Sequence, residues 1–137
     1  MRVYYGSQYG FVRDGKPVFP EFSDSAHTAE KALTPASGVT LQVGIDFGLT
    51  PAAVFGQRLA NGRWLVLGEL VTEEMGAARF ADELGRVIQE RYEGLDLRLT
   101  GDPAGRQRAQ TDERTPYDIL RAAGFEARPA ETNDFII

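Results

Sequence analysis

The middle of the chain alternates apolar and polar residues with a period of two, and this pattern restricts the fold most. Between residues 40 and 47 every second residue is apolar: Leu41, Val43, Ile45 and Phe47. Successive side chains of a strand point to opposite faces, so the pattern predicts a strand, Thr40–Phe47, with one buried face. Two further strand patterns follow at Ala52–Arg58 and Arg63–Val71, and Asn61-Gly62 between them is a strong hairpin signal.

Helical and extended patterns alternate in the rest of the chain. The segment Glu74–Arg91, together with the residue after it, carries apolar residues at helical spacing, namely Phe80, Leu84, Val87, Ile88 and Tyr92. Glu73 and Glu74 are expected at its N-terminus, where negative charge is favourable. A strand at Asp96–Asp102, a helix at Pro116–Ala123 and a short strand at Phe125–Arg128 complete the series. The order β-β-β-α-β-α-β predicts an α/β fold, a mixed sheet with helices on at least one face.

The two ends of the chain differ from this regular middle. Residues 1–39 are rich in Gly, Pro, Ser and aromatic residues, and we interpret them as a linker-like segment with a short helical stretch around 26–33. Residues 40–137 form the predicted core domain. At its end, Thr132–Asp134 resembles the start of a helix and is followed by three apolar residues. We therefore expect this domain to be incomplete at its C-terminus.

Composition excludes several kinds of site. The chain has no Cys and one His, His27, which rules out thiolate chemistry and zinc sites built from several histidines. The formal net charge is −5, which argues against a module that binds DNA through charge alone. It is compatible with carboxylates that hold metal ions. The sequence contains neither a spanning apolar run nor a signal peptide, so no membrane is expected and cytosol is the default compartment.

Two aspartates lie at the ends of predicted strands. Asp46 ends the first strand in Gly44-Ile45-Asp46-Phe47-Gly48, and Asp102 ends the fourth in Gly101-Asp102-Pro103. Right-handed crossovers would place these strands side by side, and both aspartates fall on the less apolar face of their strands. Two converging carboxylates can hold Mg²⁺ or Mn²⁺, and a pair of such ions can assist phosphodiester hydrolysis. The alternative is that each aspartate shapes a turn, before Gly48 and before Pro103 respectively.

Other polar residues are weaker candidates. Arg106, Arg108 and Arg114 form a basic cluster that could hold a DNA backbone, with an ordinary solvated loop as the alternative. Arg98 is open to two interpretations, a phosphate contact or a partner for a nearby acid. Glu69 is expected at a solvent-facing edge. We interpret three further polar residues as loop or cap residues: His27, Asp112 and Asp134.

The sequence resembles a known family over nearly its whole length. The matching stretches are Val18–Phe22, Gly44–Ala53, the GDPAG segment at 101–105 and the segment 110–125. They resemble the C-terminal nuclease domain of phage terminase large subunits, which has a ribonuclease H-like fold. The resemblance implies a five-stranded sheet in the order 3-2-1-4-5, with strand 2 antiparallel and helices packed on it.

The resemblance also implies a function, that of an endonuclease of DNA packaging in the host cell cytoplasm. The enzyme would cleave double-stranded DNA concatemers with two ions of Mg²⁺ or Mn²⁺. Asp46 and Asp102 match the first two catalytic acids of the family, and the third, on a later helix, has no match here. The family's N-terminal ATPase motif is not found either. The terminase small subunit and the portal are the implied protein partners.

Two other functions stay open at the level of sequence. Ile45–Thr50 resembles the first phosphate loop of actin-like and sugar-kinase-like phosphotransferases, which share a ribonuclease H-like core. Such enzymes need a second, duplicated domain, for which 137 residues leave no room. The other alternative is a folded, non-catalytic remnant of the nuclease domain. Because its catalytic set lacks the third acid, we expect weak or absent activity from this chain.

Overall fold

The computed structural model describes residues 2–5, 8–11, 17–103 and 114–131. Contacts divide the chain into two compact units, Met1–Ala32 and Leu33–Ile137. In the described part of the chain, no helix combines the length and the apolar character that crossing a bilayer requires.

The first unit contains a small hairpin and a one-turn helix. Strands β1 (Arg2–Tyr5) and β2 (Gln8–Phe11) pair antiparallel, and α1 spans Asp24–His27. The hairpin was not predicted, since strands of four residues are too short to display an alternating pattern. His27 lies in α1 and not in a loop: its Nδ1 accepts a hydrogen bond from the Ser23 backbone N–H at 3.0 Å, and its ring stacks on Phe22.

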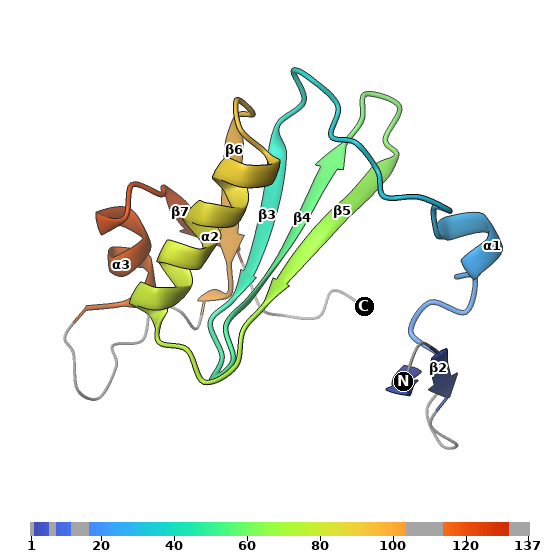
Figure 1. Cartoon of the computed structure of the whole chain (residues 1–137), viewed down its shortest axis with the longest axis horizontal. Helices are drawn as coiled ribbons and strands as arrows, with labels where there is room; N and C mark the ends of the chain where they lie inside the picture. Colours follow the sequence, from blue (N-terminus) through green and yellow to red (C-terminus); the bar gives the residue numbers. More distant parts are fainter. Residues whose placement is uncertain (1, 6–7, 12–16, 104–113, 132–137) are drawn as a thin grey trace. The chain divides into compact units, whose positions relative to one another are not determined.

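The second unit is built on a mixed five-stranded sheet (Figure 1). Its strands are β3 (Leu41–Asp46), β4 (Ala52–Arg58), β5 (Trp64–Val71), β6 (Leu97–Gly101) and β7 (Ala127–Pro129). They lie in the order β5-β4-β3-β6-β7, with β4 antiparallel to both of its neighbours and β3, β6 and β7 parallel. If these five strands are numbered 1 to 5 in chain order, starting from β3, the order in the sheet is 3-2-1-4-5. This confirms the predicted topology.

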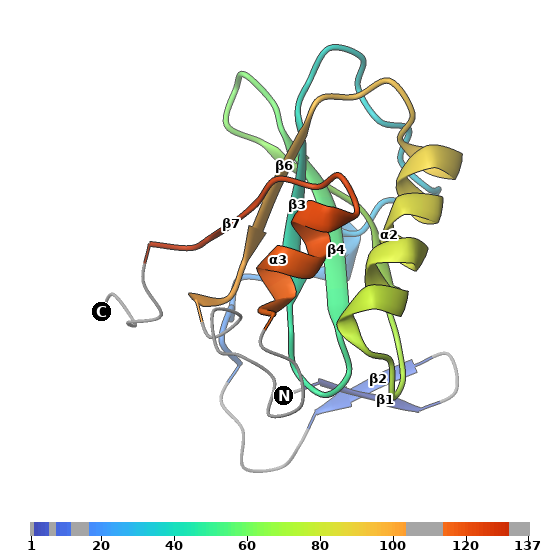
Figure 2. The ribbon, with the colours of Figure 1, turned by 90° about the vertical axis from the view of Figure 1, so that its left-hand side faces the viewer.

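Two helices, α2 (Ala77–Arg91) and α3 (Pro116–Ala122), lie on one face of this sheet (Figures 1 and 2). The connections β3–α2–β6 and β6–α3–β7 step in the same direction along the sheet. Right-handed crossovers therefore place both helices on the same side. We call this side the helix face and the opposite side, where the second unit has no helix among its described residues, the open face.

Helix α2 begins later than the sequence pattern indicated. The prediction placed Glu74 within the helix, but its φ of 44° is in the left-handed region, which interrupts a right-handed helix. Gly76 is the N-cap residue, and the first turn contains no acidic side chain. The expected contribution of Glu73 and Glu74 to the helix N-terminus is therefore wrong. Met75 instead packs against the core just before the helix starts.

The hydrophobic core lies between the sheet and these helices. All five residues of the predicted stripe on α2 are buried: Phe80, Leu84, Val87, Ile88 and Tyr92. From the sheet, the same layer receives Leu41, Val43, Ile45 and Phe55. The rings of Phe55 and Tyr92 stack with centroids 4.9 Å apart. Burying each of these large side chains contributes roughly 1.5–3 kcal/mol, so this layer is the main source of stability.

Gln57 explains why the second unit starts before the first strand of the sheet. This side chain is fully buried at the end of β4, and its amide makes three hydrogen bonds with the backbone of the preceding segment. It accepts from Ala36 N–H at 2.8 Å and donates to the carbonyls of Ala36 and Val39 at 2.9 Å each. These bonds attach residues 33–39 to the sheet, and contacts place the boundary after Ala32, whereas the sequence suggested residue 39.

Candidate functional site

The two predicted site aspartates lie at the carboxyl ends of adjacent parallel strands. Ile45 of β3 is the register partner of Gly101 of β6, so Asp46 and Asp102 each come one residue later. The ladder continues past the end of β6, because the backbone N–H of Asp102 donates to the carbonyl of Ile45 at 3.2 Å. The structure thus brings the two positions to one edge of the sheet, where open α/β sheets bind ligands.

Alternation along the strands relates both aspartates to the open face. Ile45 is buried on the helix face, and Asp46, the next residue, is exposed. A Cβ atom placed on Gly101 would meet Tyr117 of α3, which shows that this position faces the helices. The following residue, Asp102, therefore takes the opposite direction as long as the backbone stays extended.

Asp46 also forms the turn that the alternative interpretation assigned to it. Its Oδ1 atom accepts a hydrogen bond from the backbone N–H of Gly48 at 3.0 Å, which is a typical Asx-turn contact. Such a bond occupies one lone pair of one carboxylate oxygen and fixes the orientation of the group. The other lone pairs can still ligate a cation, so the turn and the metal-site interpretations are compatible.

Asp102 is held through its backbone by the helix face. The Tyr117 hydroxyl donates to the carbonyl oxygen of Asp102 at 2.8 Å, and the ring of Tyr117 packs edge-on against Phe47 with centroids 5.0 Å apart. Both rings press against Gly101: an added Cβ there would lie 2.6 Å from Phe47 Cε2 and 2.6 Å from Tyr117 Oη. Glycine is therefore required at this position, which sets the end of β6 on which Asp102 depends.

The position of Tyr117 depends in turn on the start of α3. Thr115 is the N-cap residue, and its hydroxyl oxygen accepts from the backbone N–H of Asp118 at 3.2 Å. The Asp118 carboxylate accepts from the Thr115 backbone N–H at 2.9 Å, which completes a capping box. The backbone hydrogen bond from Thr115 is the main reason why the pKa of Asp118 lies below its usual value.

Some of the other polar residues predicted as candidates lie among the described residues, and others do not. Arg106, Arg108, Asp112 and Asp134 lie outside the described residues. Arg114 is exposed just ahead of α3, and Glu69 is exposed on the edge strand β5, as predicted. Among the described residues, no group of three or more acidic or histidine side chains is placed to hold a metal ion. The described site thus offers two carboxylates, Asp46 and Asp102.

The open face contains a shallow apolar hollow over β3, β4 and β5. Its volume is about 330 Å³, and its lining includes Gly44, Val54, Gly56, Trp64 and Val66. The exposed fractions of Trp64 and Val66 are 56% and 67%, high values for large apolar side chains. Sheet faces are normally covered by other elements, so such exposure marks a surface able to associate. Gly44 and Gly56, on neighbouring strands, contribute no side chain to its lining.

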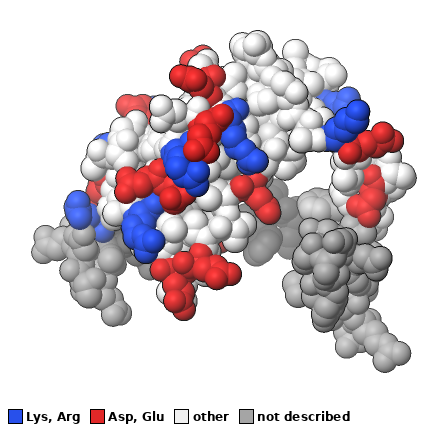
Figure 3. Space-filling view, in the orientation of Figure 1, with Lys and Arg blue, Asp and Glu red and all other residues white. Residues whose placement is uncertain are grey.

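Charge is distributed evenly on the opposite side of the unit. Figure 3, which shows the side of the helices, has acidic and basic side chains interspersed over α2. Arg86 of α2 contacts both Glu83 at 2.7 Å and Glu90 at 3.1 Å, and Arg121 of α3 contacts Asp118 at 3.2 Å. The two glutamates raise the pKa of Arg86 through these hydrogen bonds. These arginines are therefore engaged with neighbouring acids.

Comparison with known proteins identifies a structural relative. The structure of the large terminase from a thermophilic bacteriophage superimposes with a TM-score of 0.62 at 17% sequence identity. The match covers 82% of this chain and 28% of the terminase chain. No family model and no curated protein sequence matches. The chain thus shares the fold of about a quarter of a large terminase, and the mixed α/β sheet is consistent with a ribonuclease H-like fold.

Proposed function

We propose that this chain carries a divalent-metal-dependent endonuclease site that cleaves double-stranded DNA during packaging of a phage genome. The observation that best supports the proposal is the placement of Asp46 and Asp102 at adjacent ends of parallel strands. The shared fold with a large terminase agrees with it. By the same resemblance, the host cell cytoplasm is the proposed location, and the terminase small subunit and the portal are the proposed protein partners.

The donor atoms of the site fit the expected metal. Carboxylate oxygens are the ligands that Mg²⁺ and Mn²⁺ prefer, and Asp46 presents such oxygens at an exposed position. When bound, two such ions orient an attacking water and stabilise the leaving oxygen of a phosphodiester. The contribution of the chain is to aim the carboxylates: Gly48 orients the side chain of Asp46, and Tyr117 fixes the backbone of Asp102.

Two carboxylates provide little charge for this task. A pair of divalent ions about 4 Å apart carries four positive charges, whose mutual repulsion is large in a partly desolvated site. Asp46 and Asp102 supply two negative charges, which suffice for one ion better than for two. We therefore expect weak cleavage that requires a high metal concentration. A non-catalytic domain is the second candidate, and the two-acid set among the described residues favours it.

A plasmid assay tests the site. Conversion of supercoiled DNA to nicked and linear forms should require Mn²⁺ or Mg²⁺, stop with EDTA and vanish in Asp46→Asn, which keeps the shape of the side chain and removes its charge. Asp82→Asn is the matched control, because Asp82 is exposed on α2 and away from the site. Cleavage that persists unchanged in Asp46→Asn would place the active site elsewhere.

Metal binding separates the nuclease from the non-catalytic domain. Titration with Mn²⁺, followed by calorimetry, should show at least one site whose affinity drops about tenfold or more when one carboxylate is neutralised in Asp46→Asn or Asp102→Asn. Equal, weak binding by the wild type, both variants and the Asp82→Asn control would support the non-catalytic alternative.

A further inference from the structure

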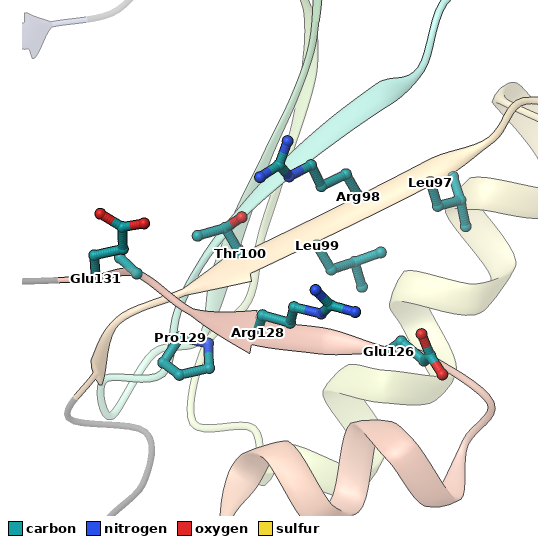
Figure 4. A pocket seen from close by; sticks show the side chains of 9 residues that line it. Leu97, Arg98, Leu99, Thr100, Glu126, Arg128, Pro129 and Glu131 are labelled. Carbon is teal, nitrogen blue, oxygen red and sulfur yellow. The ribbon is translucent and has the colours of Figure 1, made fainter.

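A second hollow lies over the parallel strands β6 and β7, and Thr100 lines both hollows. Its volume is about 780 Å³, and Arg98, Thr100 and Arg128 are among the residues that line it (Figure 4). Thr100 and Arg128 are register partners on adjacent strands, and Arg98 precedes Thr100 by two residues. All three positions therefore belong to the open face, the face of Asp46.

The two arginines of this hollow differ from Arg86 and Arg121 of the helix face. Both are exposed, and within the described part of the chain neither forms an ion pair or a side-chain hydrogen bond. Arg86 and Arg121, in contrast, contact acids at 2.7–3.2 Å. A guanidinium carries five N–H donors, so Arg98 and Arg128 present unused donors to whatever enters the hollow.

Two glutamates also line the hollow, and their position is informative. Glu131 and Glu126 lie toward opposite ends of the pocket, and neither contacts a described arginine within ion-pair distance (Figure 4). The positive groups and the Thr100 hydroxyl, which can donate a hydrogen bond, lie between them. These donor groups in the middle of the hollow suit an anion with several oxygen acceptors. The two glutamates limit the positively charged part of the hollow at its ends.

We propose that Arg98, Thr100 and Arg128 form a groove for the sugar-phosphate backbone of DNA, next to the carboxylate pair. The inference rests on the proposed function. Along β6, residues of one face recur every second position, so Thr100 lies roughly 7 Å and Arg98 roughly 13 Å from Asp102. If the scissile phosphate of a duplex lies at Asp46 and Asp102, neighbouring phosphates of the same strand would lie along β6, over Thr100 and Arg98. Arginine suits the contact because its planar donors match phosphate oxygens.

The groove can be tested without cleavage. Binding of a fluorescent duplex of about 30 base pairs is measured by anisotropy in EDTA over a series of salt concentrations. In Arg98→Ala/Arg128→Ala, we expect the affinity to fall on the order of tenfold at low salt. The slope of log K against log salt should become shallower by about two, one unit for each phosphate contact removed. Circular dichroism verifies that the variant is folded.

A matched variant controls for net charge. Arg79→Ala/Arg86→Ala removes the same charge from exposed positions of α2, on the helix face, and should change the salt slope little. The glutamates provide the opposite test: Glu126→Gln/Glu131→Gln should tighten binding several-fold, since it removes negative charge beside the groove. Equal losses in the two arginine pairs would overturn the groove, as would a wild type that does not bind DNA at low salt.

The same measurements keep this inference separate from the nuclease proposal. Weakened binding in Arg98→Ala/Arg128→Ala, together with cleavage that is absent or insensitive to Asp46→Asn, would support the groove and contradict the nuclease. Cleavage that depends on Asp46, together with an unchanged salt slope in the arginine variant, would contradict the groove alone.

Discussion

The two faces of the sheet have the same strands but very different surroundings. On the helix face, side chains such as Phe55 and Val43 are fully enclosed by α2 and its neighbours. On the open face of the same sheet, Val54 and Val66 are 49% and 67% exposed. The exposed residues Asp46 of β3 and Arg98 of β6 both occupy open-face positions. The comparison indicates that one face stabilises the unit, and the other carries residues on which both proposals rest.

The largest effect should come from removing a large apolar side chain on the helix face, compared with removing one on the open face. Phe55→Ala removes a fully buried ring that stacks on Tyr92, and we expect it to lower the free energy of unfolding by about 3–5 kcal/mol. Val66→Ala, on the open face of the neighbouring strand, should cost no more than about 0.5 kcal/mol. Urea denaturation measures both. Similar losses in the two variants would show that the open face is covered in solution.

Two glycines in adjacent strands sharpen the comparison. Gly101→Ala places a Cβ against Phe47 and Tyr117 on the helix face and should cost about 1–3 kcal/mol. Gly44→Ala meets nothing within 4 Å on the open face, and it should be neutral or stabilise the strand by about 0.5–1 kcal/mol. Thermal unfolding distinguishes them. A stable Gly101→Ala protein would contradict the close packing that positions Asp102.

The smallest effect concerns the capping box at the start of α3, the helix whose Tyr117 bonds to the backbone of Asp102. The pKa of Asp118 is lowered in the folded chain, so its contribution to stability is present above its ordinary pKa of about 3.8. That contribution is lost as pH falls through the lower, folded-state value. The difference in urea midpoint between wild type and Asp118→Ala should therefore be constant from about pH 7 to about pH 5 and shrink below about pH 4.

A control removes an acid that has no capping role. Asp82→Ala takes an exposed carboxylate from α2, and the comparison with Asp118→Ala isolates the capping box from the change in net charge. A difference between wild type and Asp118→Ala that grows as the solution becomes more acidic than about pH 4 would contradict the assigned sign. Because α3 carries Tyr117, weaker Mn²⁺ binding in Asp118→Ala would further link the cap to the position of Asp102.

Much of the second unit could be predicted from periodicity. The sequence predicted the bounds that β4 has in the structure, Ala52–Arg58, because the Pro51 and Asn61-Gly62 breaks delimit that stretch. Elements without such signals were missed or misplaced: the four-residue strands β1 and β2, and the start of α2, where Glu74 adopts a left-handed conformation. Gln57 produced no signal either, because its three partners belong to a segment far away in sequence.

The sequence by itself determined the order of strands and helices in the second unit and the two aspartates at strand ends, since each depends on neighbouring residues and on the handedness of crossovers. The tertiary structure alone decided which residues meet across the chain. It placed Arg128 beside Thr100, attached residues 33–39 through Gln57 and set Tyr117 against Gly101. Such contacts depend on register and packing between distant segments, which local patterns do not encode.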